Sequence, residues 1–379
     1  MARDVVVIGA GVIGSLCAFR LAKAGANVTL LEREVSGPGA SRNSAAMLEA
    51  QLDAYRGKPF LPLASASQKL FPALAEELLS LTGINIELEQ CGILQAALDE
   101  NERSSLKSEM QRHIVEGWSA RWLEPADIAL EFPALTHQAY GAIFYEDDGQ
   151  VNGINFLEAS RKAAAAAGAK VILDAGDVKL WIENGNVKGV EAGERHVADA
   201  VVVAAGAWTD ALIAPLGVRL GIEPVRGQLL WYQTAARMLP APVYTKNGAY
   251  LCPKTRGVML AGTTTERVGF KGEVTEEGRA SIAAAIQKLS PDVAGHDVFT
   301  STAGLRPASP DGLPFLGPLA AHPNVFIASG HHRNGVLLAP ITADVITAQV
   351  LGGELPLDVS AFSANRSVPQ PVPAGTPLS

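Results

Sequence analysis

The sequence predicts a mixed α/β protein, α+β overall, with more than one domain. Three observations predict this fold class. Val5–Ile8 and Ala200–Gly206 are short apolar runs of β-branched and small residues, the pattern of parallel strands buried on both faces. Helical apolar spacing follows the first of these runs and also precedes Lys170–Asp174, a further predicted strand. Strands of antiparallel character occupy residues 223–302, which indicates a second, mixed sheet.

The N-terminal residues contain one complete βαβ unit. The strand Val5–Ile8 is followed at once by the glycine pattern GAGVIG at positions 9–14, and helical spacing then continues until Gly25. A second strand, Asn27–Leu31, ends at Glu32. Strand, glycine turn, helix, strand and terminal acid in this order predict a Rossmann-like dinucleotide-binding unit.

Each part of this unit has a physical role in binding a dinucleotide. Gly9 permits the tight turn, Gly11 lets a pyrophosphate approach the backbone, and Gly14 allows the helix to pack close to the strand. The helix N-terminus offers free N–H groups to phosphates, and Glu32 can accept hydrogen bonds from ribose hydroxyls. The motif alone leaves FAD and NAD open. Because no second GxGxxG follows, FAD in this site would take its electrons directly from an organic substrate.

Composition and charge exclude several partners. A formal net charge of -8 and a pI near 5.5 argue against nucleic acid or an anionic membrane, since both require clustered Lys and Arg. Cys17, Cys91 and Cys252 lack the spacing of a metal site or a disulfide framework, so we expect no metal and a reducing compartment. Glycines interrupt the apolar stretch after Arg3, and no run of about 18 apolar residues occurs elsewhere. We therefore expect a cytoplasmic protein without a signal peptide or a transmembrane segment.

The rest of the chain predicts further elements. Ser36–Ala50 has the small, polar composition of a loop that passes close to a cofactor, and Gly83 ends a leucine-rich helix. Beyond Gly352 the chain is rich in Pro and Ser, and we expect it to fray. The other expected elements are a hairpin of 178–182 and 187–190, a helix over 275–289, a strand over 325–328 and an apolar helix over 336–350.

Six segments, in order along nearly the whole chain, resemble the glycine oxidase and D-amino acid oxidase (DAO) family of FAD-dependent oxidoreductases, and bacterial glycine oxidase-like proteins in particular. They are VVVIGAGVIGSLCAFRLAKAGANVTLLER, SAAM at 44–47, VVVAAGAWTDAL, VRGQLL, AGLRPASPDGLPFLG and ASGHHRNGVLLAP. The resemblance implies FAD as cofactor. Non-covalent binding is expected, because the C-terminal segment has no cysteine where sarcosine oxidases attach FAD.

The resemblance also implies a division into domains. In this family a Rossmann-like FAD-binding domain is assembled from separated segments, and a discontinuous substrate domain carries a large mixed or antiparallel sheet. The implied segments are 1–83, 141–220 and 303–365 for the FAD-binding domain, 84–140 and 221–302 for the substrate domain, and 366–379 for a C-terminal tail.

A substrate site follows from the same resemblance. Arg306, in AGLRP, takes the place of the family arginine that binds the substrate carboxylate, and a guanidinium fork suits that role because it grips both oxygens. Tyr250 matches a tyrosine that assists the same carboxylate, so both residues are predicted to be catalytic. Met47, His332 and Arg333 complete the predicted substrate-binding set. From residue types alone, an ion pair for Arg306 and a core position for Tyr250 stay open.

The predicted cofactor contacts lie in the glycine turn, the loop after the second strand, two further strand ends and the start of the last helix. A helix N-terminus at 330–337 is expected to stabilise negative charge on the flavin pyrimidine ring. Ala46 stands where relatives often have glycine, and His332 replaces a common aromatic residue, so the pocket shape stays open. The predicted cofactor-binding residues are Gly9, Gly11, Val12, Ile13, Gly14, Glu32, Arg33, Ser41, Asn43, Ser44, Ala46, Met47, Val178, Ala205, Gly206, Trp208, Arg306, Gly330, His332, Arg333, Asn334, Gly335, Val336 and Leu337.

The implied reaction is hydride transfer from the α-carbon of a small amino acid or amine, of the glycine, sarcosine or D-amino acid type, to flavin N5. The resulting imine would hydrolyse, and O2 or an electron carrier would reoxidise the flavin. Three alternatives stay open: a flavin-dependent dehydrogenase that acts on a 2-hydroxy acid or passes electrons to a quinone or other carrier, an NAD-dependent dehydrogenase, and a flavin-binding module without turnover. The sequence also leaves the oligomeric state open.

Overall fold

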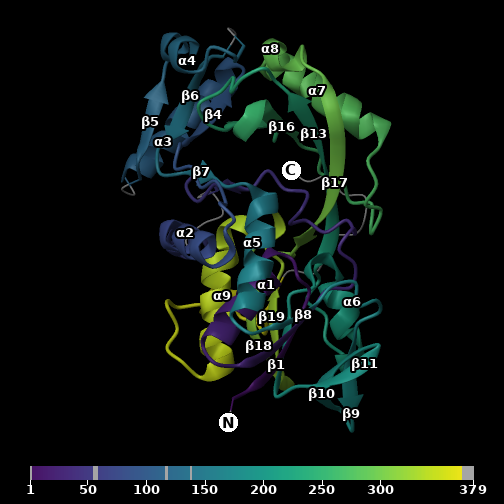
Figure 1. Ribbon diagram of the computed structural model, residues 1–379. Helices are drawn as coiled ribbons and strands as arrows, with labels where there is room; N and C mark the ends of the chain where they lie inside the picture. The colour runs from purple at the N-terminus through teal and green to yellow at the C-terminus, as the bar shows by residue number, and fades with distance from the viewer. Residues whose placement is uncertain (1, 54–58, 116–117, 137–138, 369–379) are drawn as a thin grey trace.

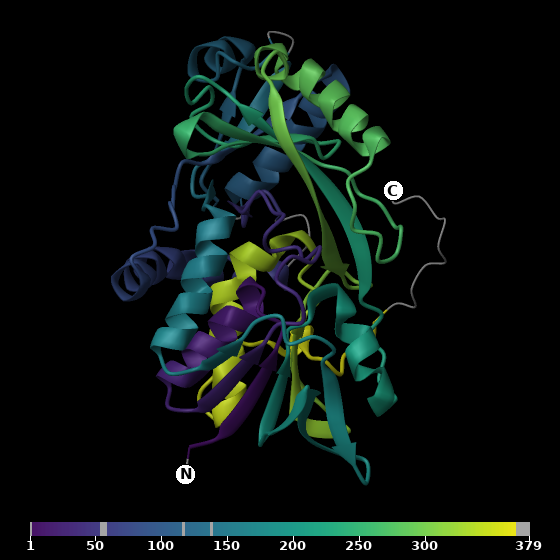
Figure 2. The same ribbon diagram turned by 45° about the vertical axis from the view of Figure 1, so that its right-hand side comes forward.

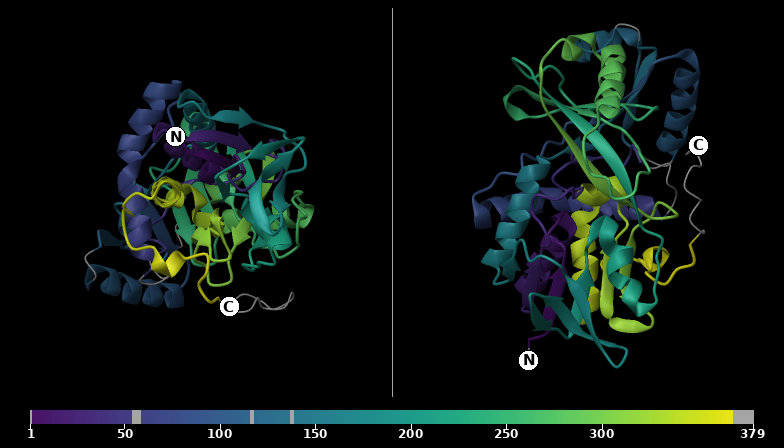
Figure 3. Two further views of the ribbon diagram at one scale, coloured as in Figure 1. Left: turned by 90° about the horizontal axis from the view of Figure 1, so that it is seen from below. Right: turned by 90° about the vertical axis from the view of Figure 1, so that its right-hand side faces the viewer.

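The protein has two layers, each built around its own sheet (Figure 1). The computed structural model describes residues 2–53, 59–115, 118–136 and 139–368. A six-stranded sheet with its helices forms the half that contains the N-terminus, and an eight-stranded sheet forms the other half. The side view in Figure 3 shows the two halves stacked along the long axis of the molecule.

The six-stranded sheet has the order β18-β19-β12-β1-β2-β8. Neighbouring strands run parallel from β19 to β8, and β18 pairs antiparallel with β19 at one edge. Val5 and Val7 pack into one hydrophobic core and Val6 and Ile8 into another, so β1 is buried on both faces as its sequence predicts. The strands are β1 (Asp4–Ile8), β2 (Asn27–Leu31), β8 (Lys170–Ile172), β12 (Ala200–Val203), β18 (Phe315–Leu319) and β19 (His322–Ser329).

Helices cover one face of this sheet and a small hairpin sheet covers the other. Apolar residues of the four helices α1 (Val12–Lys23), α2 (Phe60–Thr82), α5 (Gly153–Ala166) and α9 (Gly335–Leu351) form the first core. The opposite core includes residues of β9 (Lys179–Glu183) and β10 (Asn186–Ala192), which confirms the predicted hairpin; β11 (Glu194–Val197) completes that sheet.

The eight-stranded sheet has the order β17-β13-β16-β15-β14-β4-β6-β5. All neighbours are antiparallel except β14 and β4, so the sheet is mixed, as predicted. Its long strands β13 and β17 run side by side from this sheet toward the six-stranded sheet (Figure 2). The strands are β4 (Ile93–Ala97), β5 (Ala120–Leu123), β6 (Gly141–Tyr145), β13 (Glu223–Gln233), β14 (Val243–Thr245), β15 (Tyr250–Pro253), β16 (Val258–Gly262) and β17 (Val298–Ala308).

Shorter elements complete the structure. The predicted helix at 275–289 is present as α7 (Glu276–Leu289), and the Thr275 side chain caps it by accepting a hydrogen bond from the Gly278 N–H. Gly83 ends α2 in the left-handed conformation, as its position predicts. The remaining elements are β3 (Met47–Leu48), β7 (Gly149–Gln150), α3 (Glu100–Val115), α4 (Pro125–Glu131), α6 (Thr209–Ile213), α8 (Pro291–Ala294) and the 3-10 turns η2 (Gly206–Trp208), η3 (Ala214–Leu216), η4 (Thr255–Gly257), η5 (His332–Asn334) and η6 (Ser360–Phe362).

Two strands pair in the second sheet although their residues fall in segments predicted for the FAD-binding domain. The division into domains itself stays a proposal. Gly141–Tyr145 falls in the implied FAD-binding segment 141–220, but as β6 it pairs with β4 and β5 in the eight-stranded sheet. Residues 303–308 belong to β17 and pair with β13 in that same sheet. The reason is physical: both segments find their hydrogen-bonding partners across the second sheet, whereas the boundaries were implied by the family resemblance.

The expected fraying after Gly352 is wrong for the residues up to 368. Phe362 is buried, and Arg366 places its guanidinium over the Phe315 ring at 3.8 Å from the centroid. Arg366 also donates to both Asp311 carboxylate oxygens, over 2.7 and 2.9 Å. Apolar and ionic contacts thus hold this segment against β18, despite its Pro- and Ser-rich composition. The predicted tail 366–379 lies largely outside the described residues.

One helix in the described part of the chain has the length and apolar composition of a membrane span. It covers His332–Leu351, and 67% of its most apolar window is buried inside the protein. Its residues from Val336 to Val350 pack against α1 and α2 in the core of the first layer. Burial in this core accounts for the apolar composition of α9.

Candidate active site

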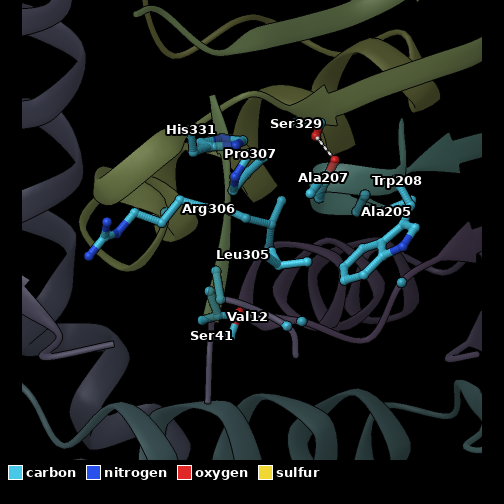
Figure 4. Close-up of a pocket in the computed structure, with 18 of the residues that line it drawn as sticks. Val12, Ser41, Ala205, Ala207, Trp208, Leu305, Arg306, Pro307, Ser329 and His331 are labelled. Atoms are coloured by element: carbon cyan, nitrogen blue, oxygen red, sulfur yellow. Dashed lines mark hydrogen bonds between the residues drawn. The ribbon is translucent and has the colours of Figure 1, made fainter. Parts of the chain in front are cut away.

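One cavity of about 660 Å³ runs between the two layers and is lined by residues of both. At one end lie the GAGVIG turn, Glu32 and Trp208, and at the other end lie Tyr250, Arg306 and Arg333. In Figure 4 the Arg306 side chain extends toward one side of the view, and the Trp208 indole lies on the other. The cavity therefore joins the predicted nucleotide site to the predicted substrate site.

Glycine is sterically required in the turn between β1 and α1. Gly9 has a φ of +100°, and a Cβ there would lie 2.4 Å from the Ala204 carbonyl oxygen. A Cβ on Gly14 would lie 1.9 Å from the Gly9 carbonyl oxygen. Gly14 therefore packs the helix onto the turn, as predicted, and does not itself line the cavity. The N-terminus of α1 opens into the cavity at Gly11 and Val12.

The carboxylate of Glu32 is held at the end of β2. One oxygen accepts a hydrogen bond from the Ala10 N–H over 2.8 Å, and the other accepts from the Glu34 N–H over 3.3 Å. Arg33 lies over the Trp208 ring, 4.7 Å from the centroid. A fixed carboxylate at the end of β2 and an open helix N-terminus are features that bind the ribose and the pyrophosphate of an adenosine dinucleotide, so this end of the cavity fits FAD.

Arg161 is a buried residue at this end that sequence reasoning missed. Its Nε donates to the Ala10 carbonyl over 2.8 Å, and burial lowers the pKa of its guanidinium. Arg161 lines the cavity beside the glycine turn. A single arginine in the Ala-rich helix α5 carries no local signal, and only the packing of α5 against α1 brings it to the nucleotide end.

Arg306 projects from β17 and lies flat across the neighbouring strand. Its guanidinium donates to the Thr263 hydroxyl over 2.6 Å and to the Thr264 carbonyl over 3.1 Å. A Cβ on Gly227 of β13 would lie 2.1 Å from its Nη2, so only glycine leaves room for this pose. Burial lowers the pKa of the Arg306 guanidinium, which still remains a cation at neutral pH.

Tyr250 is placed by a second glycine. A Cβ on Gly262, its partner across β15 and β16, would lie 2.5 Å from the Tyr250 hydroxyl oxygen. The Tyr250 ring stacks on the Tyr244 ring, with centroids 6.3 Å apart. Tyr250 is only 6% exposed, and burial raises the pKa of its hydroxyl. Tyr244, which also lines the cavity, was not predicted.

Arg333 is fixed by a carboxylate that sequence reasoning also missed. Its Nε donates to Asp53 over 3.1 Å, its Nη2 contacts the second Asp53 oxygen, and its Nη1 donates to the Tyr244 hydroxyl over 2.6 Å. Glu49, another cavity residue, lies 3.5 Å from the Arg333 Nε. Asp53 is fully buried. The chain thus sets Arg333 rigidly in the cavity wall.

The loop before α9 brings only part of its predicted residues to the cavity. His332 and Arg333 line it, and so do Gly335 and Val336. Leu337 instead packs in the core, and Asn334 donates its side-chain amide to Asp53 over 2.7 Å. Of the predicted cofactor residues, the cavity lining lacks Gly14, Gly330, Asn334 and Leu337.

His331 lines the cavity although it was not predicted as a site residue. Its Nε2 lies 3.0 Å from the Thr342 hydroxyl, and burial lowers the pKa of its imidazole to about 3. A neutral imidazole at this position adds no positive charge to that of Arg333 and the N-terminal end of α9.

Ala46 lies on the cavity wall in a strained conformation. Its φ is +55°, which costs roughly 1–3 kcal/mol for a residue other than glycine. The Ala46 carbonyl accepts from the Val151 N–H over 3.0 Å, and Met47 follows it into β3. The predicted residues Ser41, Asn43, Ser44, Ala46 and Met47 all line the cavity, so the loop after β2 forms a continuous wall.

A glycine-bordered nucleotide site that opens directly into a pocket with Arg306 and Arg333 is the arrangement of a dinucleotide-binding protein that takes a second ligand. Comparison with known proteins makes this specific. A family model described as DAO, FAD dependent oxidoreductase, matches residues 4–349. The chain is similar to the glycine oxidase of Geobacillus kaustophilus (strain HTA426), with 34% identity over 96% of this chain and 97% of that protein. It is 32% identical to the glycine oxidase of Pseudomonas aeruginosa (strain PAO1), over 96% of this chain and 99% of that protein.

A solved structure agrees with these relatives. The crystal structure of glycine oxidase from Geobacillus kaustophilus superimposes with a TM-score of 0.92, at 33% identity, and covers 97% of this chain and 100% of that one. This chain belongs to the DAO family and is an FAD-dependent oxidoreductase. Of the alternatives left open by the sequence, the NAD-dependent dehydrogenase is therefore set aside.

Proposed function

We propose that this enzyme oxidises a small amino acid or a related amine at its α-carbon, using non-covalently bound FAD. The observation that carries the proposal is Arg306, which lies flat across Gly227 beside Tyr250 inside the cavity that continues into the nucleotide site. The similarity to glycine oxidases supports a glycine, sarcosine or D-amino acid type of substrate.

In this proposal Arg306 binds the substrate carboxylate. Thr263 and Thr264 already hold its guanidinium, so little side-chain freedom is lost when a carboxylate binds. The Tyr250 hydroxyl donates a further hydrogen bond, and Met47 borders the same space. Two contacts at the carboxylate fix the direction of the α-carbon, which is what an oriented hydride transfer requires.

The two tyrosine hydroxyls near Arg306 are poor proton acceptors. Burial raises the pKa of the Tyr250 and Tyr244 hydroxyls, so both stay protonated at neutral pH. FAD, when bound, supplies the hydride acceptor. The chain therefore contributes orientation, exclusion of water and positive potential from the start of α9, and the substrate reacts as the neutral amine.

Non-covalent binding is proposed on the position of the cysteines. Cys17 and Cys252 are fully buried, and none of Cys17, Cys91 and Cys252 lines the cavity. The cofactor should therefore leave the protein after acid precipitation, and the supernatant should be yellow. Flavin that stays in the precipitate would contradict this part of the proposal.

The test is an anaerobic titration of the purified yellow protein with glycine, sarcosine, a panel of D-amino acids and glycolate, with the visible flavin band as readout. We expect bleaching by one of the amines and release of ammonia or an amine after aerobic turnover. Bleaching by glycolate alone would establish a 2-hydroxy acid dehydrogenase instead. A band that none of these compounds changes would remove the amine oxidation proposal. Air reoxidation, followed by stopped flow with peroxide detection, then separates O2 from a carrier as acceptor.

A further inference from the structure

A buried lysine lies directly behind the cavity wall and takes no part in the proposed reaction. Lys254 follows β15 and is 9% exposed. Its ammonium donates three hydrogen bonds, to the Ala45 carbonyl over 2.7 Å, to the Gln150 side-chain oxygen over 2.8 Å and to the Val151 carbonyl over 2.9 Å. All three acceptors are neutral oxygens, and the Glu89 carboxylate, which accepts a hydrogen bond from the Gln150 side-chain amide over 2.7 Å, lies one step further away.

These acceptors surround the strained turn at Ala46. Ala45 precedes it, and Val151 is the residue whose N–H binds the Ala46 carbonyl. Lys254 thus holds both chain segments that fix the left-handed conformation of Ala46, and the segment Ala45–Met47 lines the cavity. Gln150 also pairs with Met47 between β7 and β3.

The strand connects Lys254 to the substrate end. Side chains alternate along a strand, so Tyr250, Cys252 and Lys254 follow one another on the same side of β15. Tyr250 lines the cavity, and Cys252 packs behind it with its Sγ 3.0 Å from the Gln150 side-chain oxygen and 3.6 Å from the Ala45 carbonyl oxygen. Cys252 and Lys254 therefore share two acceptors, but burial raises the pKa of the Cys252 thiol, so Cys252 stays neutral.

We propose that Lys254 is a positioning residue that fixes the Ala45–Met47 segment against the flavin, and that its buried positive charge stabilises the anionic form of the cofactor. A cation in a low-dielectric interior acts over several ångströms with little screening. The proposal rests on FAD binding at this cavity and is independent of the amine that the enzyme oxidises.

Sulfite provides a test that needs no substrate. It adds through its sulfur lone pair to flavin N5, so the flavin gains the electron pair and negative charge, and the visible band is lost. Lys254→Gln keeps a hydrogen-bond donor and removes the charge, while Lys254→Arg keeps the charge. We expect the sulfite Kd of the FAD-loaded Lys254→Gln protein to rise about tenfold or more, and that of Lys254→Arg to stay within about threefold of the wild type.

Cys252→Ala is the matched control, because it removes a neutral side chain from the same strand face and the same two acceptors. Its sulfite Kd should not change. Equal weakening of sulfite binding in Cys252→Ala and Lys254→Gln would overturn the charge role, and so would an unchanged sulfite Kd in Lys254→Gln.

Circular dichroism and FAD fluorescence report on positioning. A folded Lys254→Gln protein that loses FAD, beside a Lys254→Arg protein that keeps it, would support the positioning role. If anaerobic amines fail to bleach the flavin while sulfite behaves as expected, the proposed substrate fails and the role of Lys254 stands.

Discussion

The two ends of the cavity are built in different ways, although both depend on glycine. At the nucleotide end, Gly9, Gly14 and Glu32 lie within one βαβ unit, and each acts on a neighbour in that unit or just after the adjacent strand β12. At the substrate end, Gly227 makes room for Arg306, a residue far along the chain that the pairing of β13 and β17 brings beside it. The first end is a local motif, and the second is a product of tertiary pairing.

The largest expected effect is at the local motif. Gly14→Ala places a Cβ against the Gly9 carbonyl, so α1 must move away from the turn. We expect a loss of about 3 kcal/mol or more in the free energy of unfolding, together with loss of FAD. Urea unfolding and FAD fluorescence measure both. Gly168→Ala is the control, since Gly168 has a φ of +99° with open space around it, and should cost only about 1–2 kcal/mol. Equal effects of the two changes would show that α1 adapts freely.

The second-largest expected effect concerns Arg306, the residue proposed to bind the substrate carboxylate. Arg306→Lys removes the planar fork but keeps the charge, so we expect the substrate KM to rise about 100-fold while the FAD Kd changes little. Steady-state kinetics with the amine that bleaches the flavin gives the KM. Arg279→Lys, on α7 outside this cavity, should leave the KM unchanged. A normal KM in Arg306→Lys would remove Arg306 from the substrate site.

Gly227→Ala tests the substrate end of the cavity, where tertiary pairing of β13 and β17 places Arg306 beside Gly227. The added methyl group occupies the space of the Arg306 guanidinium, which must leave its hydrogen bonds to Thr263 and Thr264. We expect the KM to rise about tenfold, less than for loss of the fork, with FAD still bound. Gly353→Ala, which meets only ordinary contacts beyond α9, is the control. An unchanged KM would mean that the carboxylate binds without this pose of Arg306.

The same difference explains what the sequence could predict. The βαβ unit and its glycines were predicted in detail, because strand, turn and helix signals are contiguous there. Arg306 and Tyr250 entered only through a family resemblance, since neither carries a local signal. The sequence did not reveal four other residues of this region, because their roles arise from packing between β14, β15 and the segment after β3. They are Tyr244, Asp53, Glu49 and Lys254. The sheet to which β6 belongs was not visible in the sequence for the same reason: its partners, β4 and β5, decide it.

The smallest expected effect lies at the C-terminal segment, which composition alone predicted to fray. Burial by itself raises the pKa of Asp311, but the hydrogen bonds from Arg366 outweigh it and hold that pKa below its ordinary value of 3.8. A lowered folded-state pKa stabilises the protein above pH 3.8, and the stabilisation is lost as the pH falls through the folded-state pKa.

Asp311→Asn should therefore lower the free energy of unfolding at pH 7. We expect a loss of about 1 kcal/mol, because the Asp311–Arg366 pair is partly exposed. The difference from wild type should shrink below pH 3.8. Tm measured from pH 7 to pH 3 checks this. A difference that is constant over that range would assign the effect to packing of Arg366 on Phe315 and not to charge.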